Sequence, residues 1–352
     1  MTGIRSIGWW IPEARQDAAA IARDYGLSED ALAAIGLREK PVPGEGDHPS
    51  TMGARATRAA LDAAGLAVAD LDLLISAGVS KDWPAPWVEA FGVLHELGST
   101  RAAGFDLSTR CAAIIDALWL ARTLVDAGTY RTVAVCGAER FDYIMGPERR
   151  PEMATDAIFG AGAAAAIITR DAPNRIAAYS NISNPDLSSH KASGPIAGGS
   201  RRPLDGAALE EGLHRWRGQL TMREAEEIAR YSADADRHNY AALFRQAGID
   251  GIDFVACSPF FPEPQLRVLE ELGVARESTL FTIPHLGHVG AADLLLILGI
   301  AIASGRRVGR RIALSMRTNV YSNALAIVGG PEAEDGPGIA VVGHGVDLDL
   351  WR

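Results

Sequence analysis

The chain has few cysteines, no long basic run and no long apolar run. Of its 352 residues only Cys111, Cys136 and Cys257 are cysteines, and their spacing fits neither a disulfide framework nor a metal site, so we expect a reducing, cytoplasmic setting. The net charge of −10 disfavours nucleic acid or an anionic membrane surface as the main partner. The longest apolar stretch, residues 294–303, is shorter than the roughly 20 residues that cross a bilayer.

What the chain does contain is an alternation of strand-like and helix-like segments. Residues 4–10 alternate like a strand, and an alanine-rich helical pattern over residues 51–64 leads into a buried strand within residues 70–78. The same order recurs later, with a helical pattern over residues 221–248 and a strand over residues 252–257. The pattern therefore predicts an α/β fold.

The segment from Phe105 to Gly128 places a cysteine where a short strand or tight turn meets a helix. Cys111 precedes an almost uncharged run, rich in alanine and leucine, that predicts a buried helix ended by Gly128. A thiol at a helix start faces unpaired backbone N–H groups and the positive end of the helix dipole, and both favour the reactive thiolate. A free cysteine more often acts as a small apolar residue, so this segment alone does not give Cys111 a chemical role.

A second segment repeats this arrangement. His288 lies as far before Gly305 as Cys111 lies before Gly128, and the helix that Gly305 ends is again apolar. A unit of helix, turn and buried strand also recurs in both halves of the chain. Two copies of one α/β unit would pack with their buried helices in a shared interface, which would bring Cys111 and His288 together.

The repeat divides the chain into residues 1–170, with Cys111, and residues 171–352, with His288 and Asp293. A cysteine and a histidine so placed form a nucleophile and a base. Asp293, five residues after His288, could fix the tautomer of the imidazole and stabilise its protonated form.

Structural explanations for these side chains remain open at this point. Asp293 matches Asp116 in the first half, and both could be first-turn acids that the helix dipole favours. His285 and His288 could also be metal ligands, but no third ligand stands at a supporting spacing, so we expect no metal.

The sequence resembles the thiolase superfamily, and within it the ketoacyl synthase III-like enzymes. The resemblance covers nearly the whole chain. It implies a five-layered αβαβα fold of two pseudo-repeated halves, usually a homodimer, whose cysteine accepts an acyl group from a thioester. It also implies an oxyanion hole made by the backbone N–H groups of Cys111 and Gly338. The matching motifs are Phe105-Asp-Leu-Ser-Thr-Arg-Cys-Ala-Ala, Val133-Ala-Val-Cys-Gly-Ala-Glu139, Phe159-Gly-Ala-Gly-Ala, Leu286-Gly-His-Val-Gly-Ala-Ala-Asp and Gly336-Pro-Gly-Ile-Ala-Val-Val-Gly.

Two departures from the condensing members of that group bear on the reaction. Those enzymes carry His-Gln-Ala-Asn where this chain begins Ser258-Pro, and Gly-Asn where it has Gly287-His288. Their His and Asn side chains stabilise the enolate of a malonyl extender, so the absence of both disfavours carbon–carbon bond formation. The chain looks closer to acyltransferases of the same group from polyketide and other natural-product pathways, in which Cys or Ser, His and Asp form a triad. Cys111, His288 and Asp293 fit that pattern.

The resemblance thus predicts an acyltransferase. It would move an acyl group from an acyl carrier protein, or coenzyme A, through Cys111 to a hydroxyl, amine or thiol acceptor, with no cofactor beyond the phosphopantetheine of the donor. One alternative is a decarboxylating ketoacyl synthase of the priming type, which would release carbon dioxide. Another is a non-catalytic subunit of a condensing heterodimer, in which Cys111 would never be acylated.

Overall fold

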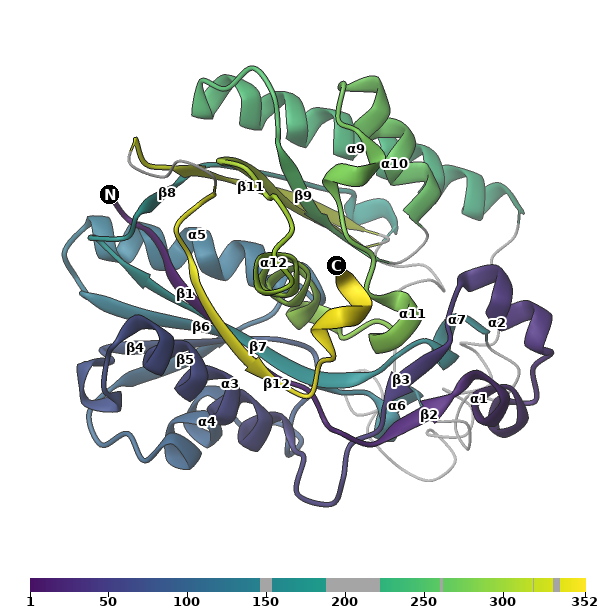
Figure 1. Cartoon of the computed structure of the whole chain (residues 1–352), viewed down its shortest axis with the longest axis horizontal. Helices are drawn as coiled ribbons and strands as arrows, with labels where there is room; N and C mark the ends of the chain where they lie inside the picture. Colours follow the sequence, from purple (N-terminus) through teal and green to yellow (C-terminus); the bar gives the residue numbers. More distant parts are fainter. Residues whose placement is uncertain (146–153, 188–221, 260–261, 319, 332–335) are drawn as a thin grey trace.

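Helices and sheets alternate in five layers (Figure 1). One layer of helices covers the first sheet, two helices lie between the sheets, and further helices cover the outer face of the second sheet. The α/β class and the αβαβα arrangement predicted from the sequence are confirmed. The computed structural model describes residues 1–145, 154–187, 222–259, 262–318, 320–331 and 336–352.

The first sheet has six strands. In chain order these are β1 (Gly3–Trp10), β4 (Leu73–Ala77), β5 (Ala103–Leu107), β6 (Thr132–Arg140), β7 (Ala161–Thr169) and β12 (Ala340–His344). Their order in the sheet is β12-β1-β7-β6-β4-β5, so β5 is an edge strand. β1 pairs with β12 in parallel and with β7 in antiparallel orientation.

The second sheet has four strands in the order β8-β11-β10-β9. These are β8 (Asn174–Ser183), β9 (Phe254–Cys257), β10 (Arg311–Arg317) and β11 (Tyr321–Gly329). The expected boundary at residue 170 falls in the turn between β7 and β8. β12 departs from that division, because it comes from the second half of the chain yet extends the first sheet through its pairing with β1. A short ribbon joins β2 (Arg15–Asp17) and β3 (Glu39–Pro41).

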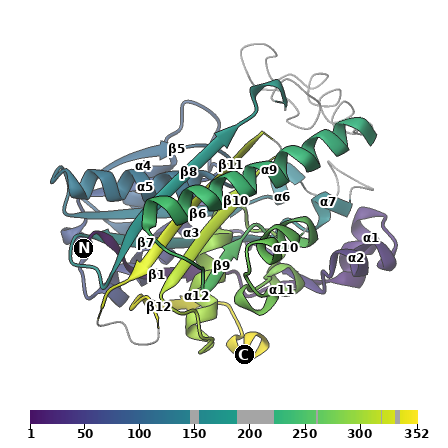
Figure 2. The ribbon, with the colours of Figure 1, turned by 90° about the horizontal axis from the view of Figure 1, so that it is seen from above.

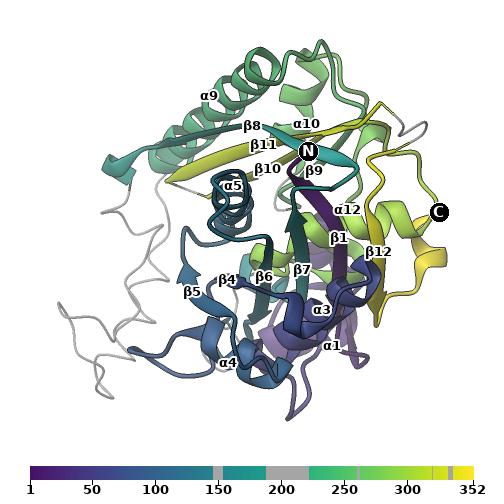
Figure 3. The same cartoon turned by 90° about the vertical axis from the view of Figure 1, so that its left-hand side faces the viewer.

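The helices occupy three layers. α5 (Ala113–Asp126) and α12 (Asp293–Ala303) lie between the sheets, and Figure 3 shows α5 enclosed by them. α3 (Pro49–Ala64) and α4 (Glu89–Leu97) cover the first sheet. α9 (Met222–Ala247) crosses the second sheet beside α10 (Pro262–Glu271), as Figure 2 shows. Among the described residues, the other α-helices are α1 (Ala18–Tyr25), α2 (Glu29–Ile35), α6 (Asp142–Met145), α7 (Ala154–Ala157) and α11 (Ile283–Leu286).

Composition explains why α5 and α12 form the central layer. α12 is apolar on every side, and its residues from Asp293 to Ala301 are all buried. A helix of that kind must be enclosed, whereas the exposed arginines of α3 mark a helix with a solvent face. Both central helices are followed by left-handed glycines, Gly128 at φ 75° and Gly305 at φ 78°, as the repeat predicted.

One buried ion pair lies between α9 and the second sheet. Asp236 is fully buried, and its Oδ2 accepts a hydrogen bond of 3.0 Å from Arg317 at the end of β10. Burial raises the pKa of Asp236 to about 6, and the charge of Arg317 opposes that rise. Because the folded chain holds this proton more tightly than an unfolded chain, with a pKa of about 3.9, the stability that depends on Asp236 falls as pH rises between about 4 and 6.

We predict that Arg317→Met lowers the free energy of unfolding by about 3–5 kcal/mol near pH 8, because it leaves a buried carboxylate without its cation. The loss should be smaller near pH 5, where Asp236 can take up a proton. Urea denaturation at the two pH values measures both quantities. Adding Asp236→Asn should restore part of the lost stability, and an equal loss at both pH values would contradict this explanation.

Candidate active site

Cys111 lies in the turn between β5 and α5, and its side chain is half-buried against the central core. The turn is strained at Arg110, the residue before Cys111. Arg110 has φ 61° and is the only non-glycine residue with a positive φ in the described part of the chain. For an L-residue this conformation costs about 1–2 kcal/mol, so contacts from the rest of the fold must hold it.

His288 approaches Cys111 from the loop between α11 and α12. Its N–H donates to the Ile158 carbonyl at 2.8 Å, and its carbonyl accepts the Gly160 N–H at 3.0 Å. Gly287, at φ 64°, makes this pairing possible, because a Cβ there would lie 2.1 Å from the Ile158 oxygen. This contact explains why the Phe159-Gly160 and Gly287-His288 motifs occur together although they are far apart in the chain.

The structure brings Cys111, His288 and Asp293 into one chain of contacts. The Cys111 Sγ lies 3.4 Å from Nε2 of His288. Nδ1 of His288 is hydrogen-bonded to Oδ2 of Asp293, whose Oδ1 accepts the Val289 N–H at 2.8 Å. His288 is 5% exposed and Asp293 is 0% exposed, so little water competes for these bonds.

The charges around His288 favour its protonated form. Burial alone would lower the pKa of His288, but the charges of Asp293 and Cys111, with their hydrogen bonds, raise it well above its ordinary value. The ring therefore keeps its second proton at a pH where an ordinary histidine, with a pKa of about 6.5, has lost it. The arrangement suits a sulfur nucleophile whose neighbouring imidazole gives and takes a proton.

Glu139, at the end of β6, holds the His288 loop against the first sheet. Its fully buried carboxyl accepts backbone N–H groups of Val79 at 3.0 Å, Ser80 at 2.8 Å and Ala291 at 3.2 Å. Burial raises the pKa of Glu139, and these hydrogen bonds oppose the rise. Gly290 packs directly on the carboxyl group, where a Cβ would lie 2.8 Å from Oε1. The sequence showed Glu139 only as part of a motif, with no signal of this contact.

A second carboxylate, Asp116, lies beside the Cys111 turn and was expected only as a first-turn helix acid. Its Oδ1 accepts hydrogen bonds from Tyr179 at 2.7 Å, Tyr321 at 2.8 Å and Asn323 at 2.7 Å, and its Oδ2 accepts the Thr109 hydroxyl. The tyrosines and the asparagine belong to β8 and β11, where no motif pointed to the site. In the sequence, only the matching positions of Asp116 and Asp293 in the repeat pointed to a place for Asp116 near the site.

The prediction that Gly338 supplies an oxyanion-hole N–H is wrong. Gly338 packs on Pro173, where an added Cβ would lie 2.8 Å from the proline ring. It lies two residues before β12, and because β12 runs parallel to β1, Gly338 lies where β1 begins. The His288 loop pairs with Phe159 just before β7, which runs antiparallel to β1, and so lies where β1 ends. The length of β1 separates Gly338 from the site.

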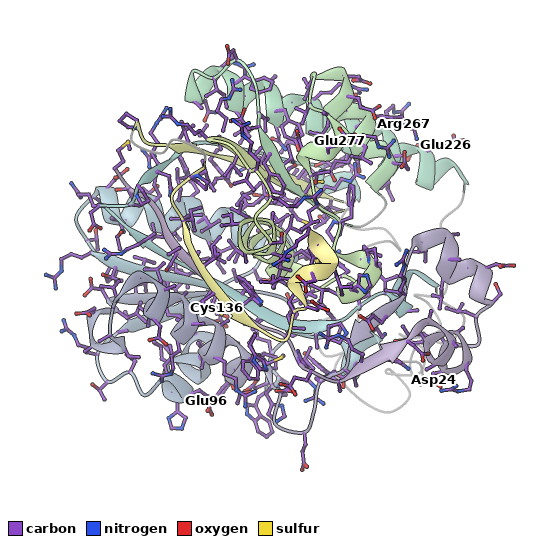
Figure 4. The ribbon with its side chains drawn as sticks, in the orientation of Figure 1. Asp24, Glu96, Cys136, Glu226, Arg267 and Glu277 are labelled. Atoms are coloured by element: carbon purple, nitrogen blue, oxygen red, sulfur yellow. The ribbon has the colours of Figure 1, made fainter. Side chains whose placement is uncertain are left out.

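The other two cysteines are structural. Cys136 contacts the Gly53 carbonyl of α3, on the side of the first sheet away from the central helices (Figure 4). Burial raises the pKa of Cys136 to about 12 and that of Cys257 to about 11. Within the described ranges, no three His, Cys, Asp or Glu side chains are grouped to hold a metal ion. None of the described helices is long and apolar enough to span a membrane.

Comparisons with known proteins agree with the fold. A family profile described as 3-oxoacyl-[acyl-carrier-protein (ACP)] synthase III matches residues 105–185. The beta-ketoacyl-[acyl-carrier-protein] synthase III of Brucella canis is 29% identical over 278 residues, which cover 77% of this chain and 80% of that protein. The acetoacetyl CoA synthase NphT7 of Streptomyces sp. strain CL190 is 28% identical over 333 residues, covering 90% of this chain and 95% of that protein.

Solved structures show the same architecture. The 3-oxoacyl-(acyl carrier protein) synthase III FabH from Pseudomonas aeruginosa PAO1 superimposes with a TM-score of 0.75 at 19% identity, covering 94% of this chain and 98% of that one. OleA of Xanthomonas campestris gives 0.75 at 16% identity, covering 93% and 96%. The chain is therefore similar in sequence to ketoacyl synthase III proteins, and its two-sheet fold is that of the solved FabH and OleA structures.

Proposed function

We propose that this protein is an acyltransferase that carries an acyl group on Cys111. The observation that supports the proposal most is the continuous contact from Cys111 Sγ through His288 to Asp293, with 3.4 Å between sulfur and Nε2. The donor is an acyl thioester on the phosphopantetheine of an acyl carrier protein or coenzyme A. The acceptor is a hydroxyl, amine or thiol, as in the polyketide and other natural-product pathways to which the sequence resemblance points.

The first half-reaction acylates the cysteine. The Cys111 thiolate attacks the thioester carbonyl, the carbon–sulfur bond to the donor breaks, and the departing thiolate takes the proton of the His288 imidazolium. The backbone N–H of Cys111, near the start of α5, is the proposed donor to the oxyanion of the tetrahedral intermediate. This step leaves an acyl-cysteine beside a neutral imidazole.

The second half-reaction uses His288 as the base. An acyl-cysteine carries no negative charge, so one of the two charges that raise the pKa of His288 is gone and the ring can remain neutral. Nε2 takes the proton of the acceptor as the acceptor attacks the acyl carbonyl, and the bond to Cys111 breaks. The thiolate and imidazolium then re-form, while Asp293 keeps the ring orientation throughout. No proton is gained or lost over the cycle.

A decarboxylating condensation is the second candidate. It is favoured by the names of the relatives, which include a beta-ketoacyl synthase III and an acetoacetyl CoA synthase. In condensing members, by the sequence resemblance, a histidine and an asparagine hold the enolate. His288 keeps one donor for an enolate oxygen, but Ser258 is 2% exposed and follows β9 with its N–H bonded to the Ser315 carbonyl. A buried serine thus stands in place of the histidine at that position.

We also propose that two chains pair along β5. This strand is an edge of the first sheet, and neighbouring segments carry Trp83 and Phe91, which are 64% and 56% exposed. An edge strand beside exposed aromatic side chains favours association. A solution mass of a single chain by light scattering would contradict this proposal.

Incubation with a panel of acyl carrier proteins and acyl-coenzyme A donors should add the mass of one acyl group to the wild-type protein. Cys111→Ala should remain unmodified, because the other two thiols are buried. Intact-protein mass spectrometry measures both, and Cys136→Ala serves as the matched control that should still be acylated. A mass increase that persists in Cys111→Ala would rule out Cys111 as the nucleophile.

Once the acyl-enzyme is isolated, His288→Ala should slow its transfer to an acceptor by about 10²- to 10⁴-fold, the usual effect of removing a general base. The wild-type acyl-enzyme mixed with carboxyl-labelled malonyl carrier should release no labelled carbon dioxide. Rapid quenching follows the transfer, and trapping of the label follows decarboxylation. Release of carbon dioxide in proportion to product would establish the condensing alternative instead.

A further inference from the structure

The two central helices carry a carboxylate at the same place. Counted back from the glycines that follow α5 and α12, Asp116 and Asp293 occupy matching positions. Asp293 ties down the loop before α12 through the His288 ring and the Val289 N–H. Asp116 has no part in the proposed chemistry, yet it bonds to the loop before α5 in a similar way.

Asp116 is held by hydroxyl and amide donors. Its Oδ1 accepts the phenol groups of Tyr179 and Tyr321, which β8 and β11 bring from the second sheet. Burial raises the pKa values of Tyr179 and Tyr321 above their ordinary value, and the Asp116 carboxylate adds to the rise at both. Both phenols therefore keep their protons and act as donors. The first turn of α5 adds the positive end of the helix dipole, which favours a carboxylate there.

The same carboxylate is tied to both sides of Cys111. Thr109, two residues before the cysteine, donates its hydroxyl to Oδ2 of Asp116. Asn323 is 0% exposed, and its Nδ2 donates to Oδ1 of Asp116 at 2.7 Å and to the carbonyl of Ala112, directly after the cysteine, at 3.0 Å. The turn that contains the nucleophile is thus fixed at its start and at its end.

We propose that Asp116 is a positioning residue for Cys111, which holds the strained Arg110–Cys111 turn so that Sγ stays beside Nε2 of His288. The left-handed conformation of Arg110 is unfavourable by itself, and the hydrogen bonds of Thr109 and Asn323 offset it. Asp116 acts only through the turn. The inference rests on the proposed role of Cys111 as the nucleophile.

Asp116→Asn tests this inference, because it keeps the shape of the side chain but removes its charge and replaces one of its two accepting oxygens by an NH2 group that donates. The rate of Cys111 acylation should fall by about 10²-fold, the usual effect of a small misplacement of a reacting group. The donor concentration that gives half the maximal rate should stay near its wild-type value. Asp126→Asn, an exposed change near the end of the same helix, is the matched control and should leave both quantities unchanged.

A conservative pair at Thr109 provides a second test that does not depend on the fold surviving the loss of Asp116. Thr109→Ser keeps the hydroxyl and should be acylated at close to the wild-type rate, whereas Thr109→Val removes the hydroxyl at similar size and should be slower. Thermal denaturation compares the stability of each variant with that of wild type. Wild-type acylation rates in folded Asp116→Asn, or equal rates in the two Thr109 variants, would overturn the inference.

Alkylation by iodoacetamide separates this inference from the proposed function, because it reports on the thiol without any acyl donor. The rate at one fixed pH should fall in Asp116→Asn and Thr109→Val but not in Thr109→Ser or Asp126→Asn. If no donor acylates the wild-type protein, the proposed function fails, while the alkylation rates still decide whether Asp116 positions Cys111. Alkylation at the wild-type rate in all four variants would contradict the positioning role.

Discussion

The proposed chemistry depends on the contact between Cys111 and His288, and that contact depends on how the two central helices pack. The two side chains lie 177 residues apart in the chain and meet at 3.4 Å only because α5 and α12 share the layer between the sheets. Both helices are apolar and buried, so the hydrophobic effect that drives them into that layer also sets the distance between sulfur and imidazole. The site therefore forms only when the two helices pack between the sheets.

Three carboxyl groups surround this contact, and all are satisfied by hydrogen-bond donors. Asp293 orients the imidazole, Glu139 anchors the loop that carries it, and Asp116 bonds to the turn that carries Cys111. Of the three, Asp293 contacts His288 directly, and its charge is the largest favourable contribution to the proton on that ring. An imidazole held and charged in this way suits proton exchange between His288 and a sulfur or oxygen atom, and transfer of an acyl group requires such an exchange.

Those parts of the site that follow a local pattern could be predicted from the sequence. Cys111 and His288 each precede an apolar helix ended by glycine, and the repeat of that pattern paired them without any knowledge of the fold. Glu139 and Asn323 could not be found in this way, because their partners are distant in the chain and meet them through sheet register. The position of Gly338 could not be predicted for the same reason. Its glycine-rich segment was recognised in the sequence, but the parallel pairing of β12 with β1 decides at which end of the sheet that segment lies.

The titration of His288, followed by NMR of the labelled imidazole, measures the coupling between the thiol and the ring on which the proposed acyl transfer depends. We predict that the free wild-type protein keeps this ring protonated well above the ordinary histidine pKa of about 6.5. The pKa should fall in Cys111→Ala, which removes the charge on one side of the ring, and fall further in Asp293→Asn, because the charge of Asp293 is the larger contribution. A His288 pKa that is the same in Cys111→Ala as in wild type would show that the thiol and the imidazole are not coupled, and would contradict their proposed role as a nucleophile and its base.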